Sequence, residues 1–172
     1  MAKSTNNSLC LQCGLCCNGV IFADVKLQPG DDPVRLQSIG LPISTPGSAF
    51  RTPHFPQPCA ALDGCRCRIY SDRPTYCRQF DCLLLKSVKE GRSQTSDALS
   101  TILTARQRAE KVRRLLRKLG DTDEHIPLAT RFKRTARRLD EVGPDPETSD
   151  TYGQLTLAFH DLNFLLSDSF YR

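Results

Sequence analysis

The sequence predicts an α+β protein in which a small cysteine-rich core of short strands and helices, nucleated by metal, is followed by an antiparallel helical bundle. All nine cysteines lie in the first half of the chain, and residues 83–172 contain none. The first half has short β-branched runs separated by proline-rich loops. The second half has three amphipathic helical patterns. We therefore expect a cysteine-cluster domain over residues 1–92 and a helical extension over residues 93–172 that packs on it.

The first cysteine group reads Cys10-x-x-Cys13-x-x-Cys16-Cys17. Two residues between successive cysteines let a tight turn bring the sulfurs to one point, as zinc–thiolate and iron–sulfur sites require. Adjacent side chains tend to point apart, so Cys16 and Cys17 fit one mononuclear site poorly. We expect Cys17 either to bridge two metals or to serve a second centre.

Disulfide bonds are the alternative use of so many cysteines. Nine is an odd number, and the polar start of the chain over residues 1–8 does not look like a signal peptide. Thiols stay reduced in the cytoplasm, which is the location we expect. Metal chelation is therefore favoured over disulfides, a redox switch or inert core cysteines. The hydrophobic content of 39% also suggests that metal replaces part of the apolar core in the first half.

Short elements are predicted between the two cysteine groups. Residues 20–27 are apolar and β-branched, which is typical of a strand. We expect either Asp31 or Asp32 to cap a short helix that has a proline in its first turn. Residues 41–58 contain five prolines and read as loop with a short strand near Phe50.

The second cysteine group begins with a predicted hairpin over residues 59–70, whose turn is Asp63-Gly64. In an extended segment, Cys65 and Cys67 would face the same side and could reach one metal. A helix follows, and we expect Ser71 or Asp72 to cap it.

Cys77 lies on this helix, and Cys82 comes five residues later. A helical pair at that spacing diverges in direction, so the helix is expected to bend or end near Phe80.

These residues resemble a known family. The pattern Cys10-x-x-Cys13-x-x-Cys16-Cys17, then Cys59-x-x-Leu62, Cys67-x-Ile69-Tyr70-x-x-Arg73-Pro74-x-x-Cys77-Arg78-x-Phe80 and Cys82, is similar to the bacterial CxxCxxCC cysteine-cluster proteins. The resemblance covers about residues 9–92. It implies a zinc- or iron-chelating domain, described for some members as iron–sulfur, and a related cluster is found in flagellin lysine methylases.

The resemblance also implies a set of metal ligands. Its eight cysteine positions map to Cys10, Cys13, Cys16, Cys17, Cys59, Cys67, Cys77 and Cys82. Cys65 has no counterpart in the family pattern, so either Cys65 or Cys67 could be the ligand in the hairpin.

Four arginines, Arg66, Arg68, Arg73 and Arg78, surround the second cysteine group. A four-thiolate zinc site and an oxidised four-iron cluster both carry a formal charge of about −2, which nearby guanidinium groups would offset. The alternative is that Arg73 and Arg78 only pack or face solvent, and for Arg66 we favour solvation.

Three helices are predicted in the second half, over about residues 96–119, 126–141 and 149–166. Ser96 or Asp97 should cap the first, and Ser149 or Asp150 the third. Each presents an apolar stripe, and short links between them favour an antiparallel bundle. The three histidines of the chain, His54, His125 and His160, are expected to be surface or bundle residues rather than ligands.

The chain carries a net charge of +5 and two basic clusters. Their members are Arg106, Arg108, Lys111, Arg113, Arg114, Arg117 and Lys118 in the first, and Arg131, Lys133, Arg134, Arg137 and Arg138 in the second. They occupy the polar faces of amphipathic helices and few aromatic residues lie nearby, so nucleic acid is not the partner we expect. No run of 18 apolar residues exists, so no membrane span is predicted either.

The chemistry that the sequence favours is chelation of zinc or an iron–sulfur cluster through eight cysteines, with the iron–sulfur cluster slightly favoured. Electron transfer or the handling of metal or clusters, together with a protein partner, is the role we expect. Two alternatives stay open, namely an interaction module with purely structural zinc and a cluster-dependent oxidoreductase or modification enzyme. The chain has no Ser–His–Asp set, HExxH, Walker loop or dinucleotide fingerprint, which argues against a standard hydrolase or nucleotide enzyme.

Overall fold

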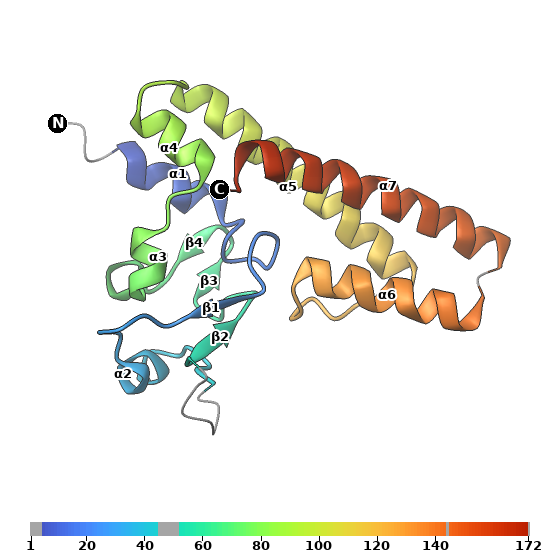
Figure 1. Cartoon of the computed structure of the whole chain (residues 1–172), viewed down its shortest axis with the longest axis horizontal. Helices are drawn as coiled ribbons and strands as arrows, with labels where there is room; N and C mark the ends of the chain where they lie inside the picture. The colour runs from blue at the N-terminus through green and yellow to red at the C-terminus, as the bar shows by residue number, and fades with distance from the viewer. Residues whose placement is uncertain (1–4, 45–51, 144, 172) are drawn as a thin grey trace. The chain divides into compact units, whose positions relative to one another are not determined.

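A computed structural model describes residues 5–44, 52–143 and 145–171 (Figure 1). The chain forms two compact units, residues 1–81 and residues 82–172. Over the described residues, it has seven α-helices and four strands of two or three residues, so the predicted α+β class is confirmed. None of the helices in the described part of the chain is long and apolar enough to cross a membrane.

The first unit begins with helix α1 (Thr5–Cys13). The tight turn that the cysteine spacing predicts is wrong for Cys10 and Cys13, because both lie on this helix. The i and i+3 positions of a helix share one face, so the Cys-x-x-Cys spacing suits a helix as well as a turn. Gly14 ends α1 with φ +69° and Gly19 has φ +76°, and turns between them carry Cys16 and Cys17.

Two short strands form the first sheet of this unit. Strand β1 (Asp24–Lys26) pairs antiparallel with β2 (His54–Pro56), and Val25 lies opposite Phe55. The predicted strand over residues 20–27 was therefore too long, because residues 20–23 and Leu27 lie outside the strand. The strand expected near Phe50 lies outside the described residues.

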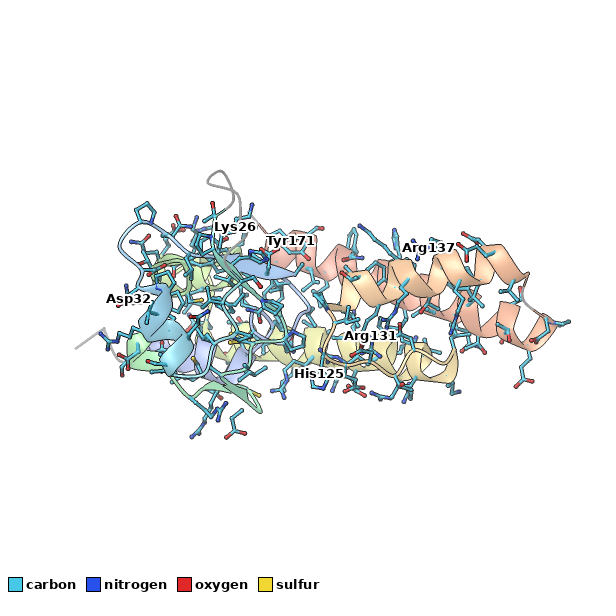
Figure 2. The ribbon with its side chains drawn as sticks, turned by 90° about the horizontal axis from the view of Figure 1, so that it is seen from below. Lys26, Asp32, His125, Arg131, Arg137 and Tyr171 are labelled. Atoms are coloured by element: carbon cyan, nitrogen blue, oxygen red, sulfur yellow. The ribbon has the colours of Figure 1, made fainter. Side chains whose placement is uncertain are left out.

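Helix α2 (Pro33–Ser38) confirms the predicted short helix. Asp32 is its N-cap and accepts a hydrogen bond of 3.0 Å from the backbone amide of Arg35. Figure 2 labels Asp32 at the start of this helix. The apolar core of the first unit joins α2 to the first sheet and consists of Val25, Leu27, Leu36, Leu41, Ile43, Phe55 and Ala61.

The hairpin of the second cysteine group consists of β3 (Leu62–Asp63) and β4 (Arg66–Cys67). Its pairs are Leu62 with Cys67 and Asp63 with Arg66, so the turn is Gly64-Cys65 and not Asp63-Gly64. Gly64 has φ +58°, which is the left-handed conformation that glycine adopts without strain. Cys65 therefore belongs to the turn, and strand alternation cannot align it with Cys67.

A 3₁₀ helix, η1 (Tyr70–Asp72), precedes helix α3 (Thr75–Gln79). Neither Ser71 nor Asp72 caps α3, because both belong to η1 and the N-cap position of α3 is Pro74. The prediction that Cys77 lies on a helix ending near Phe80 is confirmed, since Phe80 is the C-cap.

The second unit contains α4 (Leu83–Lys89), α5 (Thr95–Lys118), α6 (Leu128–Val142) and α7 (Pro146–Ser169). Helices α5 and α7 run antiparallel side by side, and α6 also packs on α5 (Figure 1). The three predicted helices are confirmed, but two caps are not. Gln94 precedes α5 without a side-chain cap, and Asp145, rather than Ser149 or Asp150, caps α7.

The apolar stripes of α5 and α7 bury each other. The buried residues are Ala98, Ile102, Ala105, Ala109, Val112, Leu115 and Leu116 on α5, with Leu155, Ala158, Leu162 and Leu166 on α7. An ion pair is also buried in this unit, because Arg131, which Figure 2 labels, donates through Nε to Asp121 Oδ1 at 2.9 Å. This unit therefore has a core of its own that contains no cysteine side chain.

Candidate metal centre

The eight cysteines that the family pattern assigns lie on six different pieces of local structure. Cys10 and Cys13 are on α1, Cys16 and Cys17 follow in the turns, Cys59 precedes the hairpin, Cys67 is in β4, Cys77 is on α3 and Cys82 is the N-cap of α4. None of the nine cysteines, all of which lie in the described residues, forms a disulfide bond.

The backbone joins the two cysteine groups directly. The amide of Cys59 donates a hydrogen bond of 2.7 Å to the carbonyl oxygen of Cys17. Cys59 and Cys77 also pack against the apolar core of the first unit. Residues from opposite ends of this unit are thus held in one place by hydrogen bonding and by apolar packing.

The side chain of Cys17 lies among thiols from both groups. Burial, and after it the neighbouring thiols of Cys59, Cys77, Cys67 and Cys13 in that order, together raise its pKa to about 12. Buried acids resist ionisation because the charged form loses its hydration, and like charges nearby add to that cost. Cys17 is therefore neutral in the metal-free protein at neutral pH.

The pKa values of Cys77 and Cys59 are raised for the same reasons. The pKa of Cys77 is raised to about 12, mainly by burial and then by the Cys59 and Cys67 thiols, while Arg73 opposes the rise. Burial and Cys67 likewise raise the pKa of Cys59, and Arg68 opposes the rise. Cys13, Cys17, Cys59, Cys67 and Cys77 thus interact electrostatically as one group, which we call the five-thiol group.

Two of the arginines near this group, Arg68 and Arg73, are held in place by hydrogen bonds to backbone carbonyls. Arg73 stacks on the Tyr70 ring with its guanidinium carbon 3.5 Å from the ring centroid, and its Nε donates to the Tyr70 carbonyl at 2.8 Å. Arg68 donates to the carbonyl of Ala60 at 2.6 Å. These hydrogen bonds hold two cations beside the thiols. Arg66 is exposed, in line with the solvation that we favoured for it.

The other four cysteines lie at four different positions in the chain. Cys10 is exposed on α1, and Cys16 is half-buried. The sulfur of Cys82 accepts a hydrogen bond of 3.4 Å from the amide of Leu85, as a helix N-cap does. Cys65 stands in the hairpin turn with its backbone against Gly14.

The histidines lie elsewhere. His54 is half-buried in β2, while His125 and His160 are exposed. Among the described cysteine, histidine, aspartate and glutamate side chains, no group of three or more is arranged so that it could hold a metal ion.

The donor set of the five-thiol group fits a soft metal. Thiolate sulfurs are the ligands that zinc and iron–sulfur clusters prefer. The five cysteines of this group are half-buried and have the cationic side chains of Arg68 and Arg73 nearby. Since thiols bind metal as thiolates, loading this group would release protons. When bound, zinc would supply structural cross-linking and an iron–sulfur cluster would supply electron transfer.

The fold and the site define a class, that of small cysteine-rich chelating domains with a helical extension. Residues 9–98 match the family described as "CxxCxxCC: Putative zinc- or iron-chelating domain", which is more than half of the 172-residue chain. The chain therefore belongs to the CxxCxxCC family, as the resemblance implied. In the same comparisons, no curated protein and no solved structure matched it.

Proposed function

We propose that this protein binds an iron–sulfur cluster or zinc in its N-terminal half and acts in electron transfer or in the handling of metal or clusters. The proposed ligands are Cys10, Cys13, Cys16, Cys17, Cys59, Cys67, Cys77 and Cys82. The observation that carries the proposal is the position of Cys17, whose thiol interacts with thiols from α1, β4, α3 and the segment before the hairpin.

The iron–sulfur cluster is slightly favoured over zinc. The Cys10-x-x-Cys13-x-x-Cys16 spacing is that of the first three cluster ligands in bacterial ferredoxins. Eight cysteines are also enough for two closed sites of four thiolates, whereas catalytic zinc needs an open position. Both arguments favour a structural or electron-transfer role over Lewis-acid catalysis.

Arg68 and Arg73 support this role. The thiolates of a closed site leave a formal charge of about −2, and cations beside the sulfurs lower the cost of keeping that charge in a half-buried place. We also propose a cytoplasmic location, where thiols stay reduced, and a protein partner.

The test is elemental analysis and visible spectroscopy of the protein purified without oxygen. We expect stoichiometric iron or zinc, and brown colour with broad visible absorption if the metal is an iron–sulfur cluster. A colourless zinc protein without redox activity would favour the structural interaction module instead. Protein that holds neither metal in stoichiometric amount would refute the proposal.

Chelator treatment extends this test. Because metal binding to such a site is coupled to folding, we expect removal of the metal to open residues 5–81 to proteolysis. The helices α5 and α7 bury their own apolar stripes and should stay protected under the same conditions.

A further inference from the structure

Asp31 makes contacts far along the chain. Its Oδ1 accepts hydrogen bonds from the backbone amide and from the Oγ1 of Thr75, both at 2.8 Å and across 44 residues. Its Oδ2 accepts the backbone amide of Gln28 at 2.8 Å. The carboxylate thus ties the turn before α2 to the start of α3.

Helix α3 depends on this contact because it has no cap of its own. Thr75 is its first residue, and the N-cap residue Pro74 has no side chain that can accept a hydrogen bond. The first amides of a helix lack intrahelical partners, and an aspartate is among the best groups to satisfy them. Asp31 therefore performs the N-cap function from a distant segment.

The direction of α3 decides where the thiol of Cys77 lies. The helix is five residues long, which is too short to hold its shape without tertiary contacts. Cys77 stands two residues after Thr75, within the first turn. Aromatic contacts also hold α3, since the rings of Tyr76 and of the C-cap residue Phe80 meet the Phe22 ring edge to face, with centroid distances of 5.8 Å and 4.9 Å.

The negative charge of Asp31 opposes, and does not assist, ionisation of the Cys77 thiol. Besides burial and the neighbouring thiols, the carboxylate of Asp31 raises the pKa of Cys77, because it repels a thiolate. Any benefit of Asp31 to a metal site must then come from its hydrogen bonds to Thr75.

We propose that Asp31 is a positioning residue of the metal site, which directs Cys77 towards the other thiols by capping α3. This inference rests on the proposed function only where zinc affinity is measured. The orientation of α3 in the metal-free protein can be measured independently.

The chain contains a matched control next to Asp31. Asp32 is also an aspartate that caps a short helix, but its helix is α2, which carries no cysteine. Both variants lose a helix cap, and Asp31→Ala also loses the hydrogen bond from the Gln28 amide. The alkylation of Cys77, which capping of α2 should not affect, is therefore the readout that separates the two variants.

The experiment compares the wild type with Asp31→Ala, Asp31→Asn and Asp32→Ala in the full chain. The first readout is zinc affinity, measured by competition with a chromophoric chelator. The second is the alkylation rate of Cys77 in reduced, metal-free protein, measured by mass spectrometry with the exposed Cys10 as internal reference.

We expect Asp31→Ala to weaken zinc binding about 10- to 100-fold, the usual effect of losing a group that orients a ligand. Cys77 should be alkylated faster in this variant, while Cys10 should not change. Asp32→Ala should match the wild type in both readouts. Asp31→Asn should recover most of the affinity, since its amide oxygen can still accept both Thr75 hydrogen bonds.

Two results would overturn the inference. The first is wild-type affinity and wild-type Cys77 reactivity in Asp31→Ala, and the second is an equal effect of Asp31→Ala and Asp32→Ala. If the wild type takes up neither zinc nor iron, the proposed function fails, and the alkylation of Cys77 still decides the positioning role.

If Asp31→Ala does not fold, Thr75→Val replaces it. This variant loses the Oγ1 contact and keeps the backbone hydrogen bond to Asp31. It should change both readouts in the same direction by a smaller factor, and unchanged values would count against the inference.

Discussion

The backbone of Cys65 lies close to the place that a side chain at position 14 would occupy. A Cβ atom at position 14 would stand 3.2 Å from the Cα of Cys65 and 3.6 Å from its Cβ. Gly14 also has φ +69°, a conformation that side-chain-bearing residues rarely adopt. The end of α1 and the turn of the hairpin can therefore approach this closely only because position 14 has no side chain.

We expect Gly14→Ala to destabilise the first unit for both reasons. The left-handed conformation alone costs about 1–2 kcal/mol for alanine, and the contact with Cys65 adds to it. Chemical unfolding measures the loss. Gly91→Ala is the control, because Gly91 has φ +70° and nothing within 4 Å of its added Cβ. Equal losses in the two variants would mean that the contact with Cys65 is relaxed at no cost.

The second prediction concerns the two cysteines of the hairpin. Cys67 interacts with Cys17, Cys59 and Cys77, whereas Cys65 lies in the turn and has no place in the eight-cysteine pattern. We expect Cys65→Ser to keep the full metal load and Cys67→Ser to lose part of it, as measured by elemental analysis.

Other outcomes of this comparison have definite meanings. Equal losses would mean that both thiols bind, and a loss confined to Cys65→Ser would reverse the assignment. If neither single variant loses metal, the double variant shows whether each thiol replaces the other.

The third prediction concerns the buried ion pair of the second unit. The side chains of Arg131 and Asp121 are 1% and 3% exposed, so Asp121→Ala would leave a buried guanidinium without its carboxylate. Removing one partner of a buried pair costs about 3–5 kcal/mol, which thermal unfolding should show. The control is Glu141→Ala, whose pair with Arg137 is 80% and 68% exposed and should matter by less than about 0.5 kcal/mol. Similar losses in both variants would contradict the prediction.

The fourth prediction is a pH dependence at the start of α7. Hydrogen bonds from the amide and hydroxyl of Thr148 hold the pKa of Asp145 below its ordinary value of 3.8. A carboxyl group with a lowered pKa stabilises the folded state above the unfolded value, and this contribution is lost as the pH falls through the folded value. Asp145→Ala should therefore melt below the wild type at neutral pH, and the difference should vanish as the pH falls below 3.8.

Asp145→Asn is the control for this effect, since asparagine caps helices but does not titrate. Its melting temperature should exceed that of Asp145→Ala at every pH. A difference between wild type and Asp145→Ala that persists in acid would show that ionisation of Asp145 is irrelevant.

Much of the fold follows from local patterns in the sequence. The apolar stripes predict α5, α6 and α7 because a periodicity of 3.6 residues is a local property of each segment. Asp32 with the proline after it predicts α2 for the same reason, since a cap and the first turn are neighbours in the sequence. The spacing of the cysteines likewise predicts soft-metal chemistry, in agreement with the family match.

The tertiary structure decided the features that depend on contacts between distant segments. The hairpin turn shifted by one residue to Gly64-Cys65, which removes Cys65 from the strand that carries Cys67. The cap of α3 comes from Asp31 instead of Ser71 or Asp72, and the carbonyl of Cys17 meets the amide of Cys59. No local pattern encodes such pairs, because the burial and hydrogen bonding that select them exist only once the chain has folded.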